Sequence, residues 1–253
     1  MGGSDVLGRI LANKKREIES LTVPVREREK PILDFRQAII DRNFICEVKK
    51  SSPTLGEINP GADVEVTAAL YESLGAACVS VLTDRDFFGG SFKDLRMVSS
   101  KVNIPVICKD FIISEKQIDV AYKNGADAVL LMATSLQKDE YNRLFAYANS
   151  LGLHVLCEIH ELSELEVVSD MPPRILGVNS RNLKNLEIDI EKGAEIIKSL
   201  PQYDVKIAES GMKTEADIRI MAEAGAVGFL VGSSLMGAEN PAEVFASLKA
   251  GLI

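Results

Sequence analysis

Residues 44–49 read FICEVK, a short apolar run that stops abruptly at a carboxylate and an ammonium group. The same pattern recurs in VICK (residues 106–109), VLCE (155–158), ILGVN (175–179) and KIAE (206–209). Three more apolar runs recur at similar spacing but do not end in a charged residue: CVSVLT (78–83), AVLLMA (128–133) and GFLVG (228–232). Such runs, separated by helical patterns, are typical of a parallel sheet buried on both faces. Together they predict an α/β fold, a single (β/α)8 TIM barrel.

The segments between the runs carry apolar residues at helical spacing. In EVTAALYESLGA, residues 65–76, Val66, Ala69 and Leu70 recur at this spacing, and Gly75 is placed to end the helix. We expect further helices in residues 115–127, 139–153, 162–170, 190–200 and 214–226. Because we find no long linker rich in Pro, Gly or Ser, we predict one barrel domain over residues 1–253.

Residues 1–43 precede the first predicted strand and form an N-terminal helical extension. A first helix is expected after a cap at Ser4 or Asp5, and a second with Pro31 in its first turn. Two interpretations are open. The helices buttress or plug the barrel, or the first of them lies across the catalytic end.

Composition restricts the classes of partner. The chain has 253 residues, 46% of them hydrophobic, and its 29 Lys and Arg against 37 Asp and Glu give a net charge of -8. This balance argues against a nucleic-acid surface and against an anionic membrane surface. No apolar run approaches a spanning helix, and the first residues lack a secretory signal. We therefore expect a cytoplasmic protein that acts on a small molecule. We also expect a monomer, although composition does not bear on this.

The cysteines indicate which way the charges point. Three of them stand directly before an ionisable residue: Cys46 before Glu47, Cys108 before Lys109, and Cys157 before Glu158. Neighbours in a strand point to opposite faces, so cysteines that face the helices would turn the ionisable groups into the barrel. The cysteines show no metal-ligand spacing, and we interpret them, with Cys78, as buried thiols. The histidines His154 and His160 also lack such spacing, so we expect ordinary packed or surface roles and no metal.

Active sites of (β/α)8 barrels lie at the carboxyl ends of the strands. The candidates there are Glu47, Lys49, Lys109, Glu158, Asn179, Arg181 and Glu209. Their alternative interpretation is an internal ion-pair network that only fills the barrel. Gly232 and Ser233 after the eighth run, with Ser210 and Gly211 after the seventh, predict a phosphate site, because loops seven and eight of many barrels bind phosphate. The loops at the carboxyl ends of the strands also contain Phe87, Phe88 and Phe111. These side chains could bind an aromatic group or simply pack there.

The residues at these strand ends and loops resemble those of a known family, indole-3-glycerol phosphate synthase. The resemblance is carried by ICEVKKSSPTLG (45–56), TDRDFFGGS (83–91), VICKDFI (106–112), CEIHE (157–161), GVNSRNLKNLEID (177–189), AESGM (208–212) and LVGSSLM (230–236). It includes the extension, whose LGRILANKKREIE (7–19) resembles a helix that lies over the substrate. The TLG after SSP and the NSRN of the sixth loop differ from the expected forms, which affects loop detail and not the reaction.

The resemblance implies a carbon-carbon lyase of tryptophan biosynthesis that needs no cofactor. It converts 1-(2-carboxyphenylamino)-1-deoxyribulose 5-phosphate into indole-3-glycerol phosphate, carbon dioxide and water. By resemblance, Lys109 is the general acid of ring closure and Glu158 the acid or base of dehydration. Lys49 pairs with substrate anions, and which lysine donates the first proton stays open. The remaining positions are implied to surround the sugar hydroxyls and the lysines (Glu47, Asn179, Glu209, Ser210), the substrate carboxylate (Arg181), the phosphate (Ser52, Gly211, Gly232, Ser233) and the ring (Phe88, Phe111).

Other functions remain conceivable from the residues alone. A phosphoribosylanthranilate isomerase would need a Cys and Asp pair at strand ends, but Cys46 has the wrong phase and no Asp ends the fifth strand. A Schiff-base aldolase could use Lys109. A non-catalytic phosphate-binding barrel would need the anion site but no acid/base pair.

Overall fold

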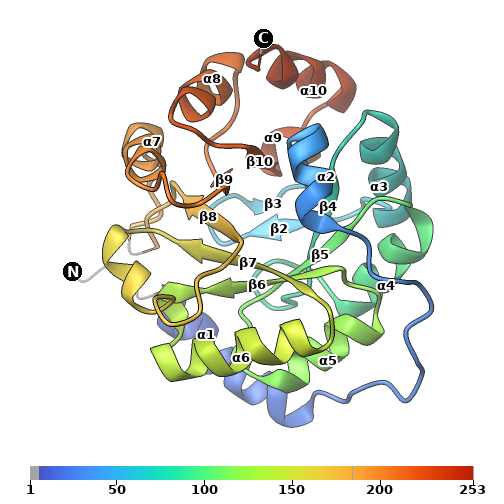
Figure 1. The fold of residues 1–253 in the computed structure, drawn as a ribbon. Coiled ribbons are helices and arrows are strands. Elements are labelled where there is room, and N and C mark those ends of the chain that lie inside the picture. Colours follow the sequence, from blue (N-terminus) through green and yellow to red (C-terminus); the bar gives the residue numbers. More distant parts are fainter. Residues whose placement is uncertain (1–5, 184, 253) are drawn as a thin grey trace.

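The computed structural model describes residues 6–183 and 185–252, and within them eight parallel strands close into a barrel (Figure 1). The strands are β1 (Phe44–Val48), β4 (Cys78–Leu82), β5 (Val106–Lys109), β6 (Ala128–Met132), β7 (His154–Ile159), β8 (Ile175–Asn179), β9 (Val205–Glu209) and β10 (Gly228–Val231). Each pairs with its neighbour in sequence, and β1 pairs with β10 to close the ring. The predicted TIM barrel is confirmed, because every one of the predicted runs is a barrel strand.

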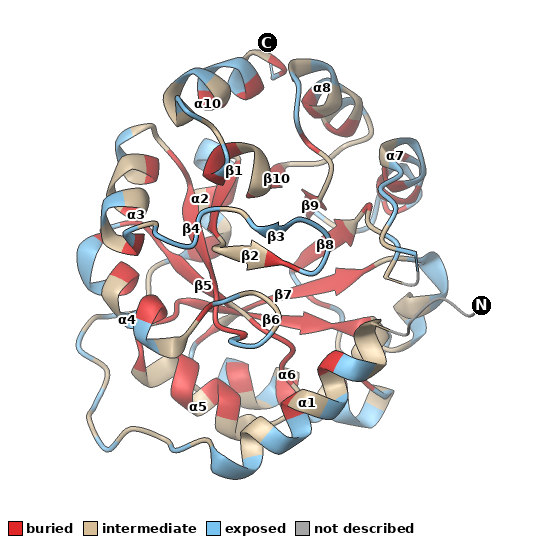
Figure 2. Ribbon diagram, turned by 180° about the vertical axis from the view of Figure 1, so that it is seen from behind, coloured by how far each residue is buried: buried red, intermediate tan, exposed pale blue. Residues whose placement is uncertain are grey.

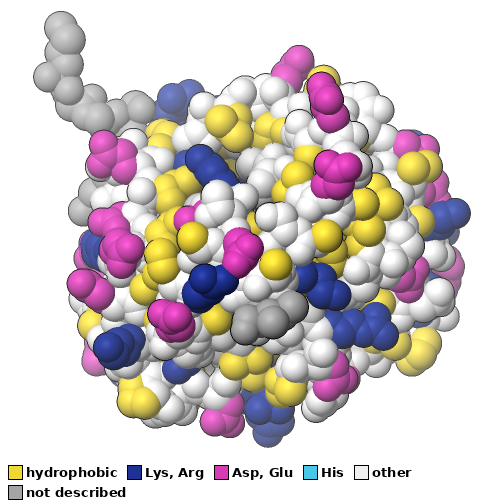
Figure 3. Space-filling view, turned by 90° about the horizontal axis from the view of Figure 1, so that it is seen from above, with side chains coloured by type: hydrophobic (Ala, Val, Ile, Leu, Met, Phe, Trp, Pro, Cys, Tyr) yellow, Lys and Arg dark blue, Asp and Glu magenta, His cyan; other side chains and the backbone are white. Residues whose placement is uncertain are grey.

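Helices surround the barrel. They are α3 (Val64–Ser73), α4 (Phe92–Lys101), α5 (Glu115–Lys123), α6 (Lys138–Ser150), α7 (Ile190–Lys198), α8 (Glu215–Glu223), α9 (Ser233–Met236) and α10 (Pro241–Ala250). Short 3-10 helices lie at η1 (Ala133–Ser135) and η2 (Leu162–Glu166), and β2 (Ser51–Ser52) pairs with β3 (Gly56–Glu57) in the loop after β1. On the face shown in Figure 3, basic and acidic side chains are interspersed rather than gathered by sign.

Two of the predicted helices differ from the structure. Residues 162–170 contain only the 3-10 turn η2, in which backbone hydrogen bonds span three residues. Pro172 and Pro173 follow closely and have no N–H to donate, which disfavours a longer helix here. Pro31 lies outside the second helix, α2 (Phe35–Arg42), which begins after Asp34; the Asp34 side chain accepts the backbone N–H of Gln37 at 2.9 Å. The predicted cap at Ser4 or Asp5 lies outside the described residues.

The alternation of the strands divides the core into two layers. Cys46, Cys108 and Cys157 belong to the layer between strands and helices, whereas Ile45, Ile107 and Leu156 belong to the layer inside the barrel. Figure 2 shows the barrel strands mostly buried and the outer helices buried mainly on the side that faces the sheet. The predicted phase is therefore confirmed, and Glu47, Lys109 and Glu158 share the inner face with the apolar residues two positions before them.

The N-terminal extension reaches both ends of the barrel. Phe35 and Ile39 of α2 are fully buried in the inner layer, where a Cβ on Gly228, at the start of β10, would meet Ile39. Helix α1 (Val6–Ser20) instead packs Ile10 into the inner layer alongside Phe111, just after the end of β5. Helix α2 therefore packs at the amino end of the barrel, and α1 packs at the carboxyl end.

The segment between the two helices is fastened by a buried ion pair. Arg28 donates to the carboxylate of Asp127 at 2.6 Å, and both side chains are almost fully buried. Asp127 also accepts the backbone N–H groups of Leu33 and Val106, so it links the segment to the amino end of β5.

We predict that Arg28→Met lowers the free energy of unfolding by about 3–5 kcal/mol, because it leaves a buried carboxylate without its cation. Urea denaturation followed by circular dichroism measures this change. The matched control is Arg36→Met, whose partner Asp204 lies 3.7 Å away and is largely exposed; the expected loss there is below about 1 kcal/mol. Equal stability of the two variants would contradict the role given to Arg28.

Candidate active site

A cavity of about 650 Å³ opens at the carboxyl ends of the strands. Residues at or just after the ends of all the barrel strands line it, and α1 contributes Val6, Leu7 and Ile10. Every site residue implied by the family resemblance lies in this lining: Glu47, Lys49, Ser52, Phe88, Lys109, Phe111, Glu158, Asn179, Arg181, Glu209, Ser210, Gly211, Gly232 and Ser233. Phe87, the other loop aromatic considered from the sequence, is not among the lining residues.

Lys109 lies at the centre of a buried charge cluster. Its Nζ is 3.0 Å from Oε2 of Glu158 and 2.6 Å from Oε2 of Glu209. The Asn179 amide donates to the other oxygen of Glu158 at 3.1 Å. These side chains come from the last residues of β5, β9 and β8 and the penultimate residue of β7, which the barrel places around one axis. The result is one ammonium group shared by two carboxylates.

A second ion pair lies at the end of β1. Lys49 Nζ is 2.8 Å from Glu47 Oε1, and the Ser80 hydroxyl donates to the other Glu47 oxygen at 3.5 Å. Arg181 follows β8, and its guanidinium donates to the backbone carbonyl of Leu186 at 3.0 Å. Lys49 and Arg181 therefore add positive charge to the cavity of an acidic protein.

Burial and neighbouring charges set opposite protonation states for the two central carboxyls. Burial disfavours ionisation of Glu158, but the positive charges of Lys109 and His160 outweigh it and lower the Glu158 pKa. Burial raises the pKa of Glu209, and the negative charge of Glu158 raises it further. Burial alone would lower the pKa of Lys109, yet the carboxylates of Glu158 and Glu209 raise it. These directions favour a charged Lys109 and an ionised Glu158, and they favour the protonated form of Glu209 although Lys109 opposes it.

His160 was expected to have an ordinary role, but it lies directly behind Glu158. Its Nε2 is 3.4 Å from Glu158 Oε1, and its Nδ1 is 3.8 Å from a Glu164 oxygen. Burial lowers the pKa of His160, but its contacts with Glu164 and Glu158 raise it overall. The spacing of Glu158 and His160, two residues apart in CEIH, places them on the same side of the chain and could have revealed this neighbour.

Small residues build the opposite side of the cavity. Gly232 precedes α9, and a Cβ there would lie 2.6 Å from Glu47 Oε1, so a larger residue would displace this carboxylate. Ser210 and Gly211 follow β9 with φ of 64° and 94°, a left-handed backbone that glycine adopts without strain but that is uncommon for a residue such as Ser210. Ser233, Ser234 and Ser52 line the same cavity with hydroxyl groups. Backbone amides at such a helix start and hydroxyl donors suit an anion such as phosphate.

Apolar side chains line the part of the cavity near α1. The Phe88 and Phe111 rings lie 6.1 Å apart between centroids, and Ile10 and Phe111 belong to the same apolar cluster. Several apolar lining residues were not predicted from the sequence, including Leu82, Met132, Leu183 and Leu230. Leu82, Met132 and Leu230 are ordinary members of barrel strands or strand ends, so only the register of the closed barrel distinguishes them from core residues.

Within the described part of the chain, no group of three or more His, Cys, Asp or Glu could hold a metal ion. No helix of residues 6–183 and 185–252 is long and apolar enough to cross a membrane.

The fold and the site together define a (β/α)8 barrel enzyme with a buried acid/base cluster. A sequence profile described as indole-3-glycerol phosphate synthase matches residues 7–248. Proteins of that name from Bacillus cereus (strain G9842) and Bacillus mycoides (strain KBAB4) are 38% and 39% identical over 98% of this chain and 99% of their own length. The chain therefore belongs to the indole-3-glycerol phosphate synthase family and is an enzyme of tryptophan biosynthesis.

Solved structures confirm the architecture alone. A 3-hexulose-6-phosphate synthase is 14% identical with a TM-score of 0.65, over 83% of this chain and 99% of that protein. A thiamine phosphate pyrophosphorylase from Pyrococcus furiosus is 15% identical with a TM-score of 0.60, over 86% of this chain and 98% of that protein.

The raised pKa of Glu209 predicts how stability depends on pH. As the pH rises above 4.5, the ordinary value, an unfolded chain loses this proton while the folded chain keeps it, so the folded state becomes less stable until Glu209 itself ionises. Glu209→Gln cannot ionise, and its free energy of unfolding should fall less steeply between about pH 5 and about pH 7 than that of the wild type. Urea denaturation across this range measures the slope.

The matched control is Glu239→Gln, at an exposed position, which should keep the wild-type slope. An unchanged slope in Glu209→Gln would show that Glu209 holds no extra proton in the folded chain.

Proposed function

We propose that this chain is a carbon-carbon lyase that converts 1-(2-carboxyphenylamino)-1-deoxyribulose 5-phosphate into indole-3-glycerol phosphate, carbon dioxide and water. The observation that carries the proposal is the position of Lys109, which lies between Glu158 and Glu209 in a cavity with an anion-binding side and an aromatic side. The substrate has the matching parts: a phosphate, an anthranilate ring, and a carbonyl between them.

Ring closure needs an acid. Lys109 donates a proton to the ribulose carbonyl oxygen, and the aromatic carbon that bears the carboxylate attacks the carbonyl carbon. The C–C bond forms, and the amino nitrogen that joins the aromatic ring to the ribulose becomes an iminium. This iminium accepts the electron pair when the bond to the carboxylate breaks and carbon dioxide leaves. The carboxylates of Glu158 and Glu209 keep the Lys109 ammonium group charged and hold it at the centre of the cavity, in place to donate.

Dehydration needs a base and restores the aromatic indole. Lys109, reprotonated from solvent, donates the proton with which the hydroxyl leaves as water, and Glu158 takes the proton that leaves the adjacent carbon. Glu158 suits this proton transfer because Lys109, His160 and Asn179 stabilise its ionised form. Glu209 contacts the same ammonium group and orients it toward the substrate.

The other residues bind the substrate. Ser52, Gly211, Gly232 and Ser233 hold the phosphate, and Arg181 and Lys49 hold the carboxylate until it leaves. Glu47, Asn179 and Ser210 lie around the sugar hydroxyls, and Phe88 and Phe111 hold the ring. Binding both ends of a flexible substrate brings the ring carbon and the carbonyl together, which lowers the entropy cost of ring closure.

We predict that Lys109→Met lowers turnover by at least about a hundredfold, the contribution of a positioned proton donor. Product is followed by its indole fluorescence, which is well resolved because the chain contains no Trp. The matched control is Lys50→Met: Lys50 pairs with Asp94 at 3.0 Å outside the cavity lining, and its loss should leave turnover nearly unchanged.

Near-normal turnover of Lys109→Met would remove Lys109 as the acid. Wild-type protein that forms no indole from the ribulose phosphate would overturn the proposed reaction itself.

A further inference from the structure

We propose that Lys14 of α1 is a positioning residue that sets the aromatic side of the active site by fastening α1 to the two loops that carry Phe88 and Phe111. The inference rests on the proposed function in one respect, that Phe88 and Phe111 hold the anthranilate ring. Lys14 itself does not line the cavity and takes no part in the proposed proton transfers.

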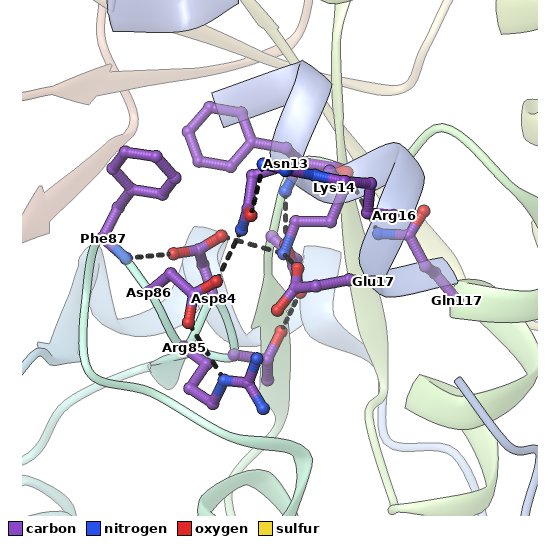
Figure 4. Close-up of polar contacts among 12 residues, drawn as sticks. Asn13, Lys14, Arg16, Glu17, Asp84, Arg85, Asp86, Phe87 and Gln117 are labelled. Carbon is purple, nitrogen blue, oxygen red and sulfur yellow. Dashed lines mark hydrogen bonds and ion pairs between the residues drawn. The ribbon is translucent and has the colours of Figure 1, made fainter. Parts of the chain in front are cut away.

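Lys14 is a buried lysine with three carboxylate partners. Only 3% of the residue is exposed. Its Nζ lies 2.8 Å from Asp84 and 2.6 Å from Glu17 (Figure 4). The same atom lies 2.8 Å from Asp110. Burial alone would lower the Lys14 pKa, but the charges of Asp110 and Asp84 raise it, so the ammonium stays charged. Asp84 and Asp110 follow β4 and β5, and one side chain of α1 therefore joins two neighbouring strand ends.

Asp84 folds the loop that carries Phe88. Its side chain accepts the backbone N–H of Phe87 at 2.8 Å, and its carbonyl accepts that of Gly90 at 2.8 Å. A Cβ on Gly90 would lie 2.0 Å from the Leu82 carbonyl, so this loop closes tightly on its own strand. A displaced Asp84 would therefore move the whole loop.

Asp110 does the same for Phe111. Its carboxylate accepts the Phe111 backbone N–H at 2.8 Å and the Thr83 hydroxyl at 2.7 Å. Asp110 is also bonded in sequence to Lys109, so the same carboxylate fixes the backbone between the proposed acid and the aromatic ring. Phe88 and Phe111 are thus placed relative to each other through Lys14.

A second contact of α1 supports the same loop. Asn13, next to Lys14 on the helix, donates to the side chain of Asp86 at 2.7 Å (Figure 4). Asp86 lies two residues beyond Asp84 in the loop after β4. One helical turn earlier than Lys14, Ile10 lines the cavity itself. The helix, the loop after β4 and the turn after β5 therefore form one wall.

Stability alone does not account for this arrangement. Apolar residues of similar volume commonly stabilise a protein as well as a buried ion cluster does, so the charges suggest a requirement for a defined geometry. The barrel offers an internal comparison, because Arg28 and Asp127 form an equally buried ion pair at the opposite end, far from the cavity lining.

The test compares Lys14→Met with Arg28→Met by two constants: the KM for the ribulose phosphate substrate, and the inhibition constant of glycerol 3-phosphate, which occupies only the phosphate side. For Lys14→Met we expect KM to rise about tenfold or more, with the inhibition constant changed less than about twofold and kcat less than about threefold. Arg28→Met is measured well below its own melting temperature, and both of its constants should stay within about twofold of the wild type.

If Lys14→Met does not fold, the triple variant K14M/D84N/D110N provides the test. It replaces Asp84 and Asp110 by neutral amides, so that neither position keeps a buried charge without its lysine. It should fold, as judged by thermal melting followed by circular dichroism, and should also raise KM about tenfold. A folded variant with wild-type KM would overturn the inference, as would an equal rise in both constants, which would indicate general damage to the site. Wild-type protein without activity would instead contradict the proposed function.

Discussion

The ammonium group of Lys109, held between the carboxylates of Glu158 and Glu209, is the interaction on which the site depends. Each of these ions would be strongly destabilised by burial without the others, because the barrel interior solvates charge poorly. Lys109 and His160 lower the pKa of Glu158, whereas burial and the negative charge of Glu158 raise the pKa of Glu209. The proposed chemistry depends on this difference, because it favours a base and an acid side by side.

The fold makes this cluster from a local rule. Residues alternate between the two faces of a strand, and a closed barrel turns one face of every strand toward a common axis. A charge near the carboxyl end of a strand therefore meets the charges of strands far away in sequence, as Lys109 meets Glu209. The loops beyond these ends supply the rest of the cavity, and α1 closes its aromatic side.

The strands and the inward phase of Glu47, Lys109 and Glu158 could be predicted from the sequence because both follow from short-range periodicity. The same reasoning erred at residues 162–170, where hydrophobic spacing suggested a helix but closely following prolines left room only for a 3-10 turn. It also placed Pro31 inside a helix that begins only after the stronger cap, Asp34. His160 and Lys14 were missed because their partners are set by tertiary contacts. A signal for Lys14 does exist, since it lies four residues from Ile10 and from Ile18, on the apolar face of α1.

The opposite protonation of the two central carboxyls is the claim from which the proposed chemistry follows. It can be measured by carbon-13 NMR of protein labelled at the glutamate side-chain carboxyl carbon, with Glu158→Gln and Glu209→Gln used to assign the signals. At about pH 7 the account predicts an ionised signal for Glu158 and a protonated one for Glu209. Two ionised signals at that pH would contradict it.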